Sequence, residues 1–158
     1  MVGILQGAFD VLLDYTGQRV AGGRPINQHL DAAMILGEIA SFITVARSAF
    51  LELAHQFDHP EIYGAWDTTS MVAKGHAVHT MITRTAADLI LKGMELMGCY
   101  GYIRENHYEK FYRDAPVAKL VMGGSHLGYF ATCRQFYDLD YSSFGPGKLT
   151  DPTGGKKK

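Results

Sequence analysis

Apolar residues recur every three or four positions along most of this chain, a spacing typical of amphipathic α-helices. One such run covers residues 2–18, a longer one about 28–57, and a third about 70–97. Within the long run, one continuous seam and a neighbouring stripe predict a wide buried face. The seam comprises Leu36, Ile39, Ile43, Ala46, Phe50, Leu53 and Phe57, and the stripe comprises Leu30, Ala33, Met34, Gly37 and Ala40.

Glycine, proline and hydroxyl residues mark where these helices end. The segment 20–26 (VAGGRPI) interrupts the pattern after the first run, and residues 68–70 (Thr-Thr-Ser) are candidate N-caps for the third. Gly75 and Gly93 lie on the same side of the third helix. Small residues on a packed face let another backbone approach, so these glycines predict a close helix crossing.

The last part of the chain predicts a short helix near 104–112 and a final helix from about Pro116 to Phe136. Pro116 suits the first turn of a helix because its missing N–H has no partner there. Gly123 and Gly124 lie within the final segment, where each costs about 1 kcal/mol relative to alanine. They therefore predict a break or a close approach at that point.

Long helices with short connections predict an all-α fold, an up-down four-helix bundle with an extra short helix. With 158 residues, the chain is long enough for one domain and too short for two of ordinary size. We expect the bundle to occupy residues 1–140 and a Gly/Pro/Lys tail to occupy residues 141–158. The three lysines that end this tail are interpreted as solubilising.

Charge and cysteine content narrow the functional classes. Fifteen basic residues oppose sixteen acidic ones, which argues against a nucleic-acid-binding protein because such proteins usually carry a basic face. Cys99 and Cys133 provide no disulfide framework, so reduced thiols in a cytoplasmic protein are expected. No stretch reaches the roughly 20 uninterrupted apolar residues of a membrane span, so no membrane partner is predicted.

Glutamate and histidine spacing raises a metal-binding alternative. Glu52 and His55 match the Glu-x-x-His pair of di-iron bundles, but such a site needs that pair twice and this chain has it once. His76 and His79 offer two nitrogens on one helix face without an obvious carboxylate partner. A metal- or small-ligand-binding bundle is therefore a third interpretation only, and no metal site is predicted.

An ordered set of short fragments resembles the C-terminal helical domain of the acyl-CoA dehydrogenase family. The most specific element is the Gly-x-Tyr-Gly-Tyr turn at 98–102, followed by Arg-Asp-Ala at 113–115. The resemblance covers about residues 1–135 and implies a four-helix bundle that forms the last third of a flavoenzyme. The other fragments are YTGQR at 15–19, GRPI at 23–26, AR at 46–47 and AK at 73–74.

The resemblance implies an activity and a set of partners. Family enzymes oxidise an acyl-CoA: a base removes a proton from Cα while a hydride leaves Cβ for FAD. This domain would make much of the contact between subunits and touch the FAD of a neighbouring subunit. The N-terminal and middle domains of the family are not matched by this sequence. The expected partner is thus an acyl-CoA dehydrogenase-like chain, in a homo- or hetero-oligomer that shares FAD and an acyl-CoA site.

Carrying the family's functional positions over one at a time yields five candidate cofactor-binding residues. Arg19 matches the arginine that is expected at the FAD pyrophosphate. Its guanidinium can bind two oxygens at once, and its alternative role is to stabilise the last carbonyls of a helix. The glycines let the backbone approach a cofactor. For Arg113, an internal ion pair with Asp114 is the favoured role. The candidates are Arg19, Gly98, Tyr100, Gly101 and Arg113.

Four positions depart from the family's pattern. Gly22 removes an aromatic wall of the cofactor site, and Glu95 brings a carboxylate that repels phosphate. The expected glutamine falls at Leu30, or at Gln28 only with a register shift. Met122 stands where many members carry the glutamate that acts as catalytic base, and a thioether cannot take a proton. No catalytic residue is therefore predicted in this chain.

We interpret the chain as a subunit or fragment of an acyl-CoA dehydrogenase-type flavoprotein, an FAD-dependent oxidoreductase on CH–CH groups that is not catalytically complete alone. It would contribute the helical oligomerisation domain and part of an FAD/acyl-CoA site completed by a partner chain. The alternative is a non-catalytic helical scaffold that has lost flavin binding, which the four departures favour.

Overall fold

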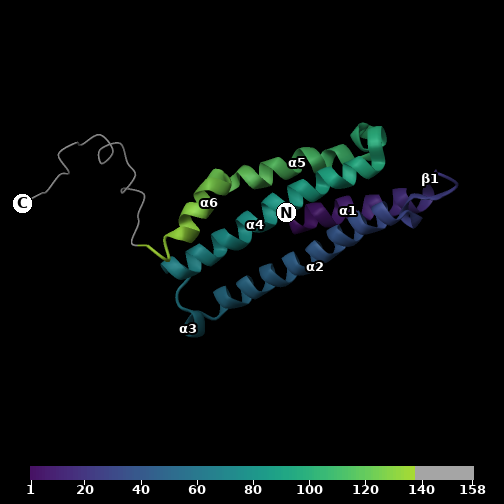
Figure 1. Ribbon diagram of the computed structural model, residues 1–158. Coiled ribbons are helices and arrows are strands. Elements are labelled where there is room, and N and C mark those ends of the chain that lie inside the picture. Colours follow the sequence, from purple (N-terminus) through teal and green to yellow (C-terminus); the bar gives the residue numbers. More distant parts are fainter. Residues whose placement is uncertain (138–158) are drawn as a thin grey trace, which may run out of the picture.

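The computed structural model describes residues 1–137, which form an elongated bundle of antiparallel helices (Figure 1). Three walls are α1 (Val2–Gln18), α2 (Leu30–Asp58) and α4 (Thr69–Met97), and the fourth is made by α5 (Tyr108–Leu120) and α6 (Gly124–Cys133) together. A single helical turn, α3 (Pro60–Tyr63), lies between α2 and α4. The predicted all-α, up-down four-helix bundle is confirmed. The tail predicted at 141–158 lies outside the described residues.

The connection after α1 is a small hairpin rather than a plain break. β1 (Val20–Ala21) pairs antiparallel with β2 (Arg24–Pro25). Gly22 and Gly23 have φ angles of 59° and 81°, the left-handed values that a tight two-residue hairpin turn requires at both positions. The sequence analysis missed these strands because two residues are too few to show an alternating pattern. A 3₁₀ turn (Ile26–Gln28) follows, so α2 begins slightly later than predicted.

The final helices differ from the prediction in their boundaries. α5 begins at Tyr108 and continues through Pro116, whereas the prediction ended a short helix near 112 and restarted at Pro116. Pro116 is exposed, so water can reach the carbonyl that loses its helical N–H partner. The predicted break is confirmed: Gly123 and Gly124 have φ of 84° and 72°, and a 3₁₀ turn (Val121–Gly123) separates α5 from α6.

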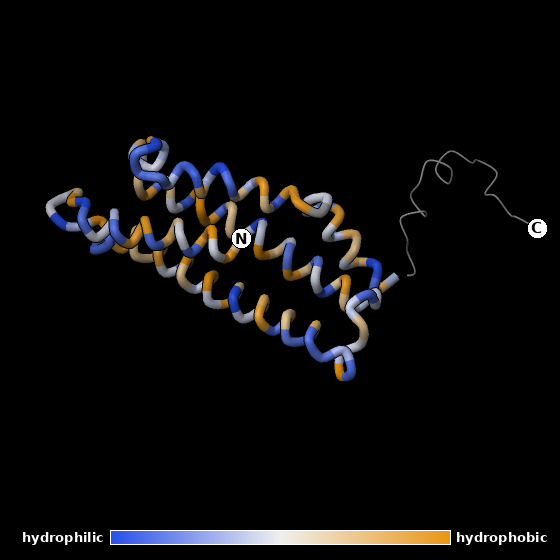
Figure 2. Tube along the Cα trace, turned by 180° about the vertical axis from the view of Figure 1, so that it is seen from behind, coloured by the Kyte–Doolittle hydropathy of each residue, from blue (hydrophilic) through white to orange (hydrophobic). Residues whose placement is uncertain are grey.

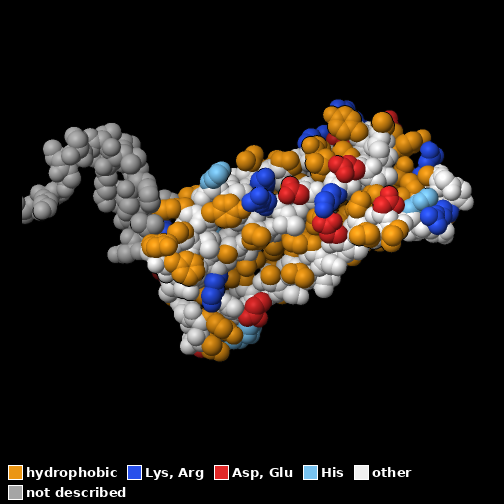
Figure 3. Space-filling view, viewed as in Figure 1, with side chains coloured by type: hydrophobic (Ala, Val, Ile, Leu, Met, Phe, Trp, Pro, Cys, Tyr) orange, Lys and Arg blue, Asp and Glu red, His pale blue; other side chains and the backbone are white. Residues whose placement is uncertain are grey.

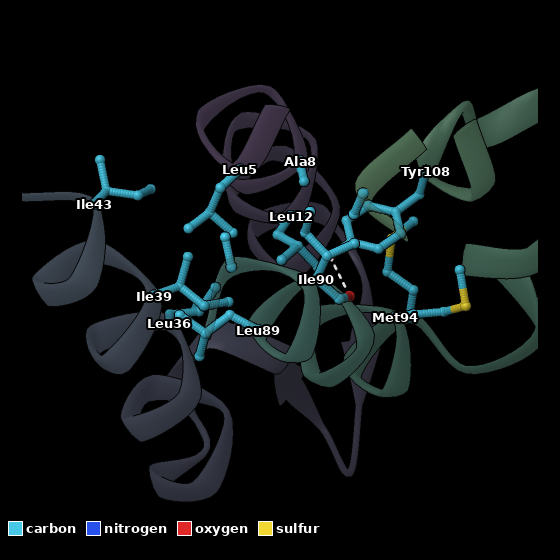
Figure 4. Packing of buried hydrophobic residues seen from close by; sticks show 13 residues of the cluster. Leu5, Ala8, Leu12, Leu36, Ile39, Ile43, Leu89, Ile90, Met94 and Tyr108 are labelled. Atoms are coloured by element: carbon cyan, nitrogen blue, oxygen red, sulfur yellow. Dashed lines mark hydrogen bonds between the residues drawn. The ribbon is translucent and has the colours of Figure 1, made fainter. Parts of the chain in front are cut away.

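The core lies where α1 meets α2, α4 and the start of α5 (Figure 4). At the other end of α4, the Thr68 hydroxyl accepts a hydrogen bond from the Met71 N–H at 3.4 Å, so one of the predicted N-caps is confirmed. Gly93 is buried against Leu12 and Tyr108, which confirms the close crossing predicted there. The labelled core residues are Leu5, Ala8, Leu12, Leu36, Ile39, Ile43, Leu89, Ile90, Met94 and Tyr108.

The seam predicted on α2 is buried for only part of its length. Its first four members are buried, whereas Phe50 and Phe57 are 53% and 38% exposed. The reason is that α1 has 17 residues and α2 has 29. The N-terminal end of α1 lies near the middle of α4 in both views (Figures 1 and 2), so the farther part of the seam has no α1 to pack against.

The second stripe on α2 faces away from the core, so the prediction of a wider buried face was wrong. Leu30 and Met34 are 75% and 66% exposed. By length and composition α2 could cross a membrane, and 22% of its 18-residue apolar window is buried. Glu38 of α2 nevertheless lies 2.8 Å from the Lys92 ammonium of α4, which places α2 as a wall of the bundle. The absence of a membrane partner stays a prediction.

Candidate functional site

Two of the predicted cofactor residues meet at one corner of the bundle, where α1 ends beside the turn that follows α4. The guanidinium carbon of Arg19 lies 5.6 Å from the centre of the Tyr100 ring, within cation–π distance. Tyr15, one turn earlier on α1, lies 6.2 Å from the same ring, and its hydroxyl donates to the Met97 carbonyl at 3.4 Å. We call Tyr15, Arg19 and Tyr100 the Arg19 corner.

In the turn that carries Tyr100, backbone conformation and packing explain why both Gly98 and Gly101 are glycines. Gly98 ends α4 with φ 58° and ψ −140°, a conformation that glycine adopts far more readily than other residues. Gly101 is buried, and a Cβ there would lie 3.2 Å from the Met94 carbonyl oxygen. Asn106 fixes the other side of the turn by donating a hydrogen bond to the Tyr100 carbonyl at 2.8 Å.

A cavity of about 520 Å³ opens beside the Arg19 corner. Among the described residues that line it, Arg19 is the only cationic side chain, whereas Asp14 and Glu105 each bring a carboxylate. The guanidinium is exposed and has no ion pair within residues 1–137. Sequence reasoning missed both carboxylates, although Asp14 lies just over one helical turn before Arg19.

FAD, which the resemblance implies, fits this corner along one edge. A guanidinium can hold one phosphate group and the Tyr100 ring offers an apolar face, while Asp14 and Glu105 repel further negative charge on the cavity side. The two phosphates of FAD would therefore need cations or backbone N–H groups from elsewhere. The corner is suited to complete a nucleotide site, not to enclose one.

Arg113, the remaining arginine of the predicted set, lies apart from the Arg19 corner. Its Nη1 is 3.1 Å from the carboxylate of Glu109 on the same helix, and it lines a separate cavity of about 470 Å³. The predicted ion pair between Arg113 and Asp114 is wrong, because Asp114 pairs with Lys110 instead. Neighbours in a helix point in different directions, whereas residues four apart share a face.

The departures from the family pattern fall at ordinary structural positions. Gly22 forms the hairpin turn, where His29 packs beside it and its Nε2 lies 2.9 Å from the Ala21 carbonyl oxygen. Leu30 is exposed at the start of α2, and Glu95 is exposed in the last turn of α4. None of these positions brings a cation to the Arg19 corner.

The turn that contains Met122 lies next to a cavity of about 460 Å³ with cationic lining. Arg84 and Lys119 line it, and none of its described lining residues is Asp or Glu. Arg84 Nη1 donates a hydrogen bond to the Tyr129 hydroxyl at 2.7 Å, and this bond raises the pKa of Arg84. These described residues offer no carboxylate in place of the family's glutamate base.

The residues considered as metal ligands do not converge. Glu52 accepts a hydrogen bond from Gln56 at 2.9 Å, and the His55 ring lies 4.3 Å from the ring of His59. Within residues 1–137, no group of three or more His, Cys, Asp or Glu side chains is placed to hold a metal ion. The metal-binding interpretation gains no support from the structure.

Residues 1–137 thus form a helical-bundle domain in which α4 leads into a Gly-x-Tyr-Gly-Tyr turn. The family model described as "Acyl-CoA dehydrogenase, C-terminal domain" matches residues 1–127. The chain therefore belongs to the acyl-CoA dehydrogenase family and corresponds to its C-terminal domain.

Individual relatives agree with this assignment. Cyclohex-1-ene-1-carbonyl-CoA dehydrogenase of Geobacter metallireducens is 26% identical over 84% of this chain and 33% of its own length. A subunit of the caffeyl-CoA reductase–Etf complex of Acetobacterium woodii is 27% identical over 80% of this chain and 31% of its own. The crystal structure of an acyl-CoA dehydrogenase from Geobacillus kaustophilus shares the fold, with a TM-score of 0.75 and 23% identity over 86% of this chain and 34% of that one. The chain spans about a third of the length of these relatives.

Proposed function

We propose that this chain supplies the C-terminal helical domain of an acyl-CoA dehydrogenase-type flavoprotein assembly, together with one edge of an FAD site that a partner chain completes. The Arg19 corner carries the proposal. Two elements far apart in the sequence place a guanidinium against an aromatic ring at an exposed edge of the bundle. A guanidinium held in this way, with no carboxylate bound to it, is free to pair with a phosphate group.

The outward face of α2 supports the assembly part of the proposal. Leu30, Met34 and Val45 are each more than half exposed on a long, largely apolar helix. Figure 3 shows further exposed hydrophobic side chains, interspersed with single charged ones, on the face that it presents. Apolar surface of this extent usually marks a contact with another protein chain. We therefore propose a homo- or hetero-oligomer with an acyl-CoA dehydrogenase-like chain.

Catalysis would depend on the partner. Bound FAD supplies the hydride acceptor in such an enzyme, and this chain's residues would hold and orient one end of it. With Met122 at the position of the family's glutamate, and no carboxylate among the described residues that line the cavity beside it, the proton-abstracting base would come from the completing chain. The acyl-CoA would bind there as well.

One observation favours a second candidate, a helical scaffold that no longer binds flavin. Asp14 and Glu105 line the same cavity as Arg19, so its charged lining is net negative. Two carboxylates near a pyrophosphate weaken binding by repulsion. This scaffold would keep the bundle and the exposed α2 face while the Arg19 corner serves only to join α1 to the glycine turn.

Native mass spectrometry of the untagged protein isolated from its own source separates the two candidates. The proposed function predicts a complex that contains a second, larger chain and FAD. A homo-oligomer without flavin would establish the scaffold instead. If the complex contains FAD, its dissociation in the gas phase would report whether the flavin leaves with this chain or with its partner.

A further inference from the structure

The connection between the glycine turn and α5 is anchored at both ends and exposed in between. At one end Gly101 is buried beside α4. At the other end Tyr108 is fully buried, and its hydroxyl donates a hydrogen bond to the Ile90 carbonyl oxygen. Residues 102–107 between these anchors are exposed, except for Asn106, which is half-buried. Asn106 is therefore the residue of this connection whose side chain is partly enclosed by the bundle.

The side chain of Asn106 ties this connection back to the glycine turn. Its Nδ2 donates a hydrogen bond to the Tyr100 carbonyl oxygen at 2.8 Å, six residues earlier in the chain. The backbone hydrogen bonds of the connection are more local. The N–H of Asn106 donates to the Ile103 carbonyl at 3.3 Å, and the N–H of His107 donates to the Arg104 carbonyl at 3.1 Å. The Asn106 amide therefore holds the second half of the connection at a fixed distance from Tyr100.

A left-handed residue follows Asn106 and fixes its backbone. His107 has φ 58° and ψ −6°, and within residues 1–137 it is the only non-glycine residue with a positive φ. Histidine adopts this conformation more often than most residues, but the conformation persists only where the surrounding structure fixes it. Here both neighbours of His107 are held, because Tyr108 is anchored in the core and Asn106 is bonded to Tyr100. The strain is thus located at the residue that aims the Asn106 side chain.

The position of the Tyr100 ring depends more on its backbone than on packing. The side chain is 50% exposed. The Tyr15 ring lies 6.2 Å from it, centre to centre, and the Arg19 guanidinium carbon lies 5.6 Å from its centre. A ring at the surface with so few neighbours moves when its backbone moves. A residue that holds the Tyr100 carbonyl therefore also determines whether the ring stays beside Arg19.

Arg19 has a competing partner in its own cavity. Glu105, the residue before Asn106, lines that cavity and forms no ion pair within residues 1–137. The other carboxylate, Asp14, already accepts a hydrogen bond from Gln18 at 2.6 Å. An exposed cation–π contact and an exposed ion pair stabilise a protein by similar amounts. A small displacement of the aromatic ring is therefore enough to change the partner of the guanidinium, and a guanidinium paired with Glu105 is no longer free to bind a phosphate.

We propose that Asn106 is a positioning residue for the Arg19 corner. By holding the Tyr100 carbonyl, it keeps the Tyr100 ring beside the guanidinium of Arg19, and this contact keeps the guanidinium away from Glu105. The consequence for FAD rests on the proposed function above, because only there does the guanidinium meet a phosphate group. The positioning itself involves residues of this chain alone, so it is measured without flavin.

Asn106→Ala tests the positioning by NMR on the full chain. Protons above the face of an aromatic ring resonate upfield, so the side-chain protons of Arg19 report its contact with Tyr100, and Tyr100→Leu gives their positions without the ring. In Asn106→Ala these resonances should move most of the way to the Tyr100→Leu positions. Asn106→Asp, which keeps the shape of the side chain but cannot donate, should give the same movement. Gln56→Ala, which removes an amide that donates to Glu52 at 2.9 Å on α2, is the matched control and should leave them unmoved. Arg19 resonances that stay in place in both Asn106 variants would overturn the proposal.

Flavin retention by the source assembly separates failure of the positioning from failure of the proposed function. Asn106→Ala should weaken retention about threefold, as expected for the loss of one neutral hydrogen bond. In a Tyr100→Leu background it should have no further effect, because the two substitutions act on the same contact. Asn106 itself lines the Arg19 cavity, so a further loss in that background would show that it contacts the ligand directly, and this too would overturn the proposal. If the Arg19 resonances move but retention is unchanged, Asn106 does position Arg19 and it is the proposed function that fails.

Discussion

The hydroxyl of Tyr108 lies against Gly93 and donates a hydrogen bond to the Ile90 carbonyl oxygen at 2.8 Å (Figure 4). Tyr108 is the first residue of α5 and is fully buried, whereas Gly93 lies three residues beyond Ile90 on α4. A tyrosine can enter the core at this depth only because α4 carries no side chain where the ring ends. The pair therefore fixes how closely the fourth wall of the bundle approaches α4.

Gly93→Ala is expected to destabilise the protein by about 1–3 kcal/mol, although alanine is the better helix former. A Cβ at this position would overlap the Tyr108 hydroxyl and the Leu12 side chain. Gly37→Ala, in a helical position of α2 with no atom within 4 Å of the added Cβ, is the control and should stabilise by about 0.4–1 kcal/mol. Urea unfolding monitored by circular dichroism measures both. Equal effects of the two substitutions would contradict the crossing at Gly93.

Tyr108→Phe is expected to cost about 0.5–1.5 kcal/mol at neutral pH through loss of the hydrogen bond to Ile90. The substitution should also remove the pH dependence that the Tyr108 hydroxyl gives to the free energy of unfolding. Burial raises the pKa of Tyr108 above its usual value of 10.0. The unfolded chain therefore loses this proton first as the pH rises, and stability that is fully present below about pH 10 is lost above it.

Unfolding free energies of the wild type and Tyr108→Phe, measured in steps from about pH 8 to pH 11, test this sign. The difference between the two proteins should be constant below pH 10 and should shrink above it. Other ionisable groups cancel in that difference because both proteins contain them. A difference that grows with pH would show that the hydroxyl ionises more readily in the folded protein.

Much of the fold could be predicted from the sequence because its signals are local. The periodicity located α1, α2 and α4, and Thr68 and the Gly123–Gly124 break followed from capping and glycine rules. The side of α2 that is buried in the bundle could not be predicted. An apolar stripe shows that a helix packs against another surface, but it does not show which element supplies that surface. The stripe that begins at Leu30 was assigned to the core for this reason.

The site was predictable only in part, and for a similar reason. Arg19 and Tyr100 were assigned through the resemblance, and the structure brings them together. Asp14 and Glu105 could not be recognised, because the sequence does not show that the end of α1 and the turn after α4 border the same cavity. Arg113 was assigned to the same cofactor, and this stays a prediction; on α5 its guanidinium pairs with Glu109, four residues earlier.

Gly98→Ala separates a structural from a cofactor role of the glycine turn. With φ 58° and ψ −140°, alanine at this position is expected to cost about 1–3 kcal/mol, although no atom lies within 4 Å of the added Cβ. Gly3→Ala, where the space is equally open and φ is not left-handed, should be neutral or slightly stabilising. Thermal unfolding of both variants measures the effect. Unchanged stability of Gly98→Ala, combined with loss of flavin from the assembly, would instead assign the glycine to the cofactor.

Arg19→Ala tests the proposed function at the residue that carries it. If the guanidinium binds a phosphate of FAD, its loss should weaken flavin retention by the source assembly about tenfold or more, since a charge-assisted hydrogen bond contributes about 1.5–3 kcal/mol. Flavin retention by Arg19→Lys should lie between that of the unaltered protein and that of Arg19→Ala, because an ammonium cannot form the two parallel hydrogen bonds of a guanidinium. The readout is the flavin absorbance that stays with the protein after gel filtration.

Arg47→Ala is the matched control for this experiment, because its guanidinium donates to Gln6 between α1 and α2 and does not line the Arg19 cavity. It should leave flavin retention unchanged. Arg19→Ala also removes the contact with Tyr100, which is expected to lower stability by about 0.5–1 kcal/mol at this exposed position. A loss of stability with full flavin retention would therefore mean that Arg19 only joins α1 to the glycine turn and does not hold the flavin.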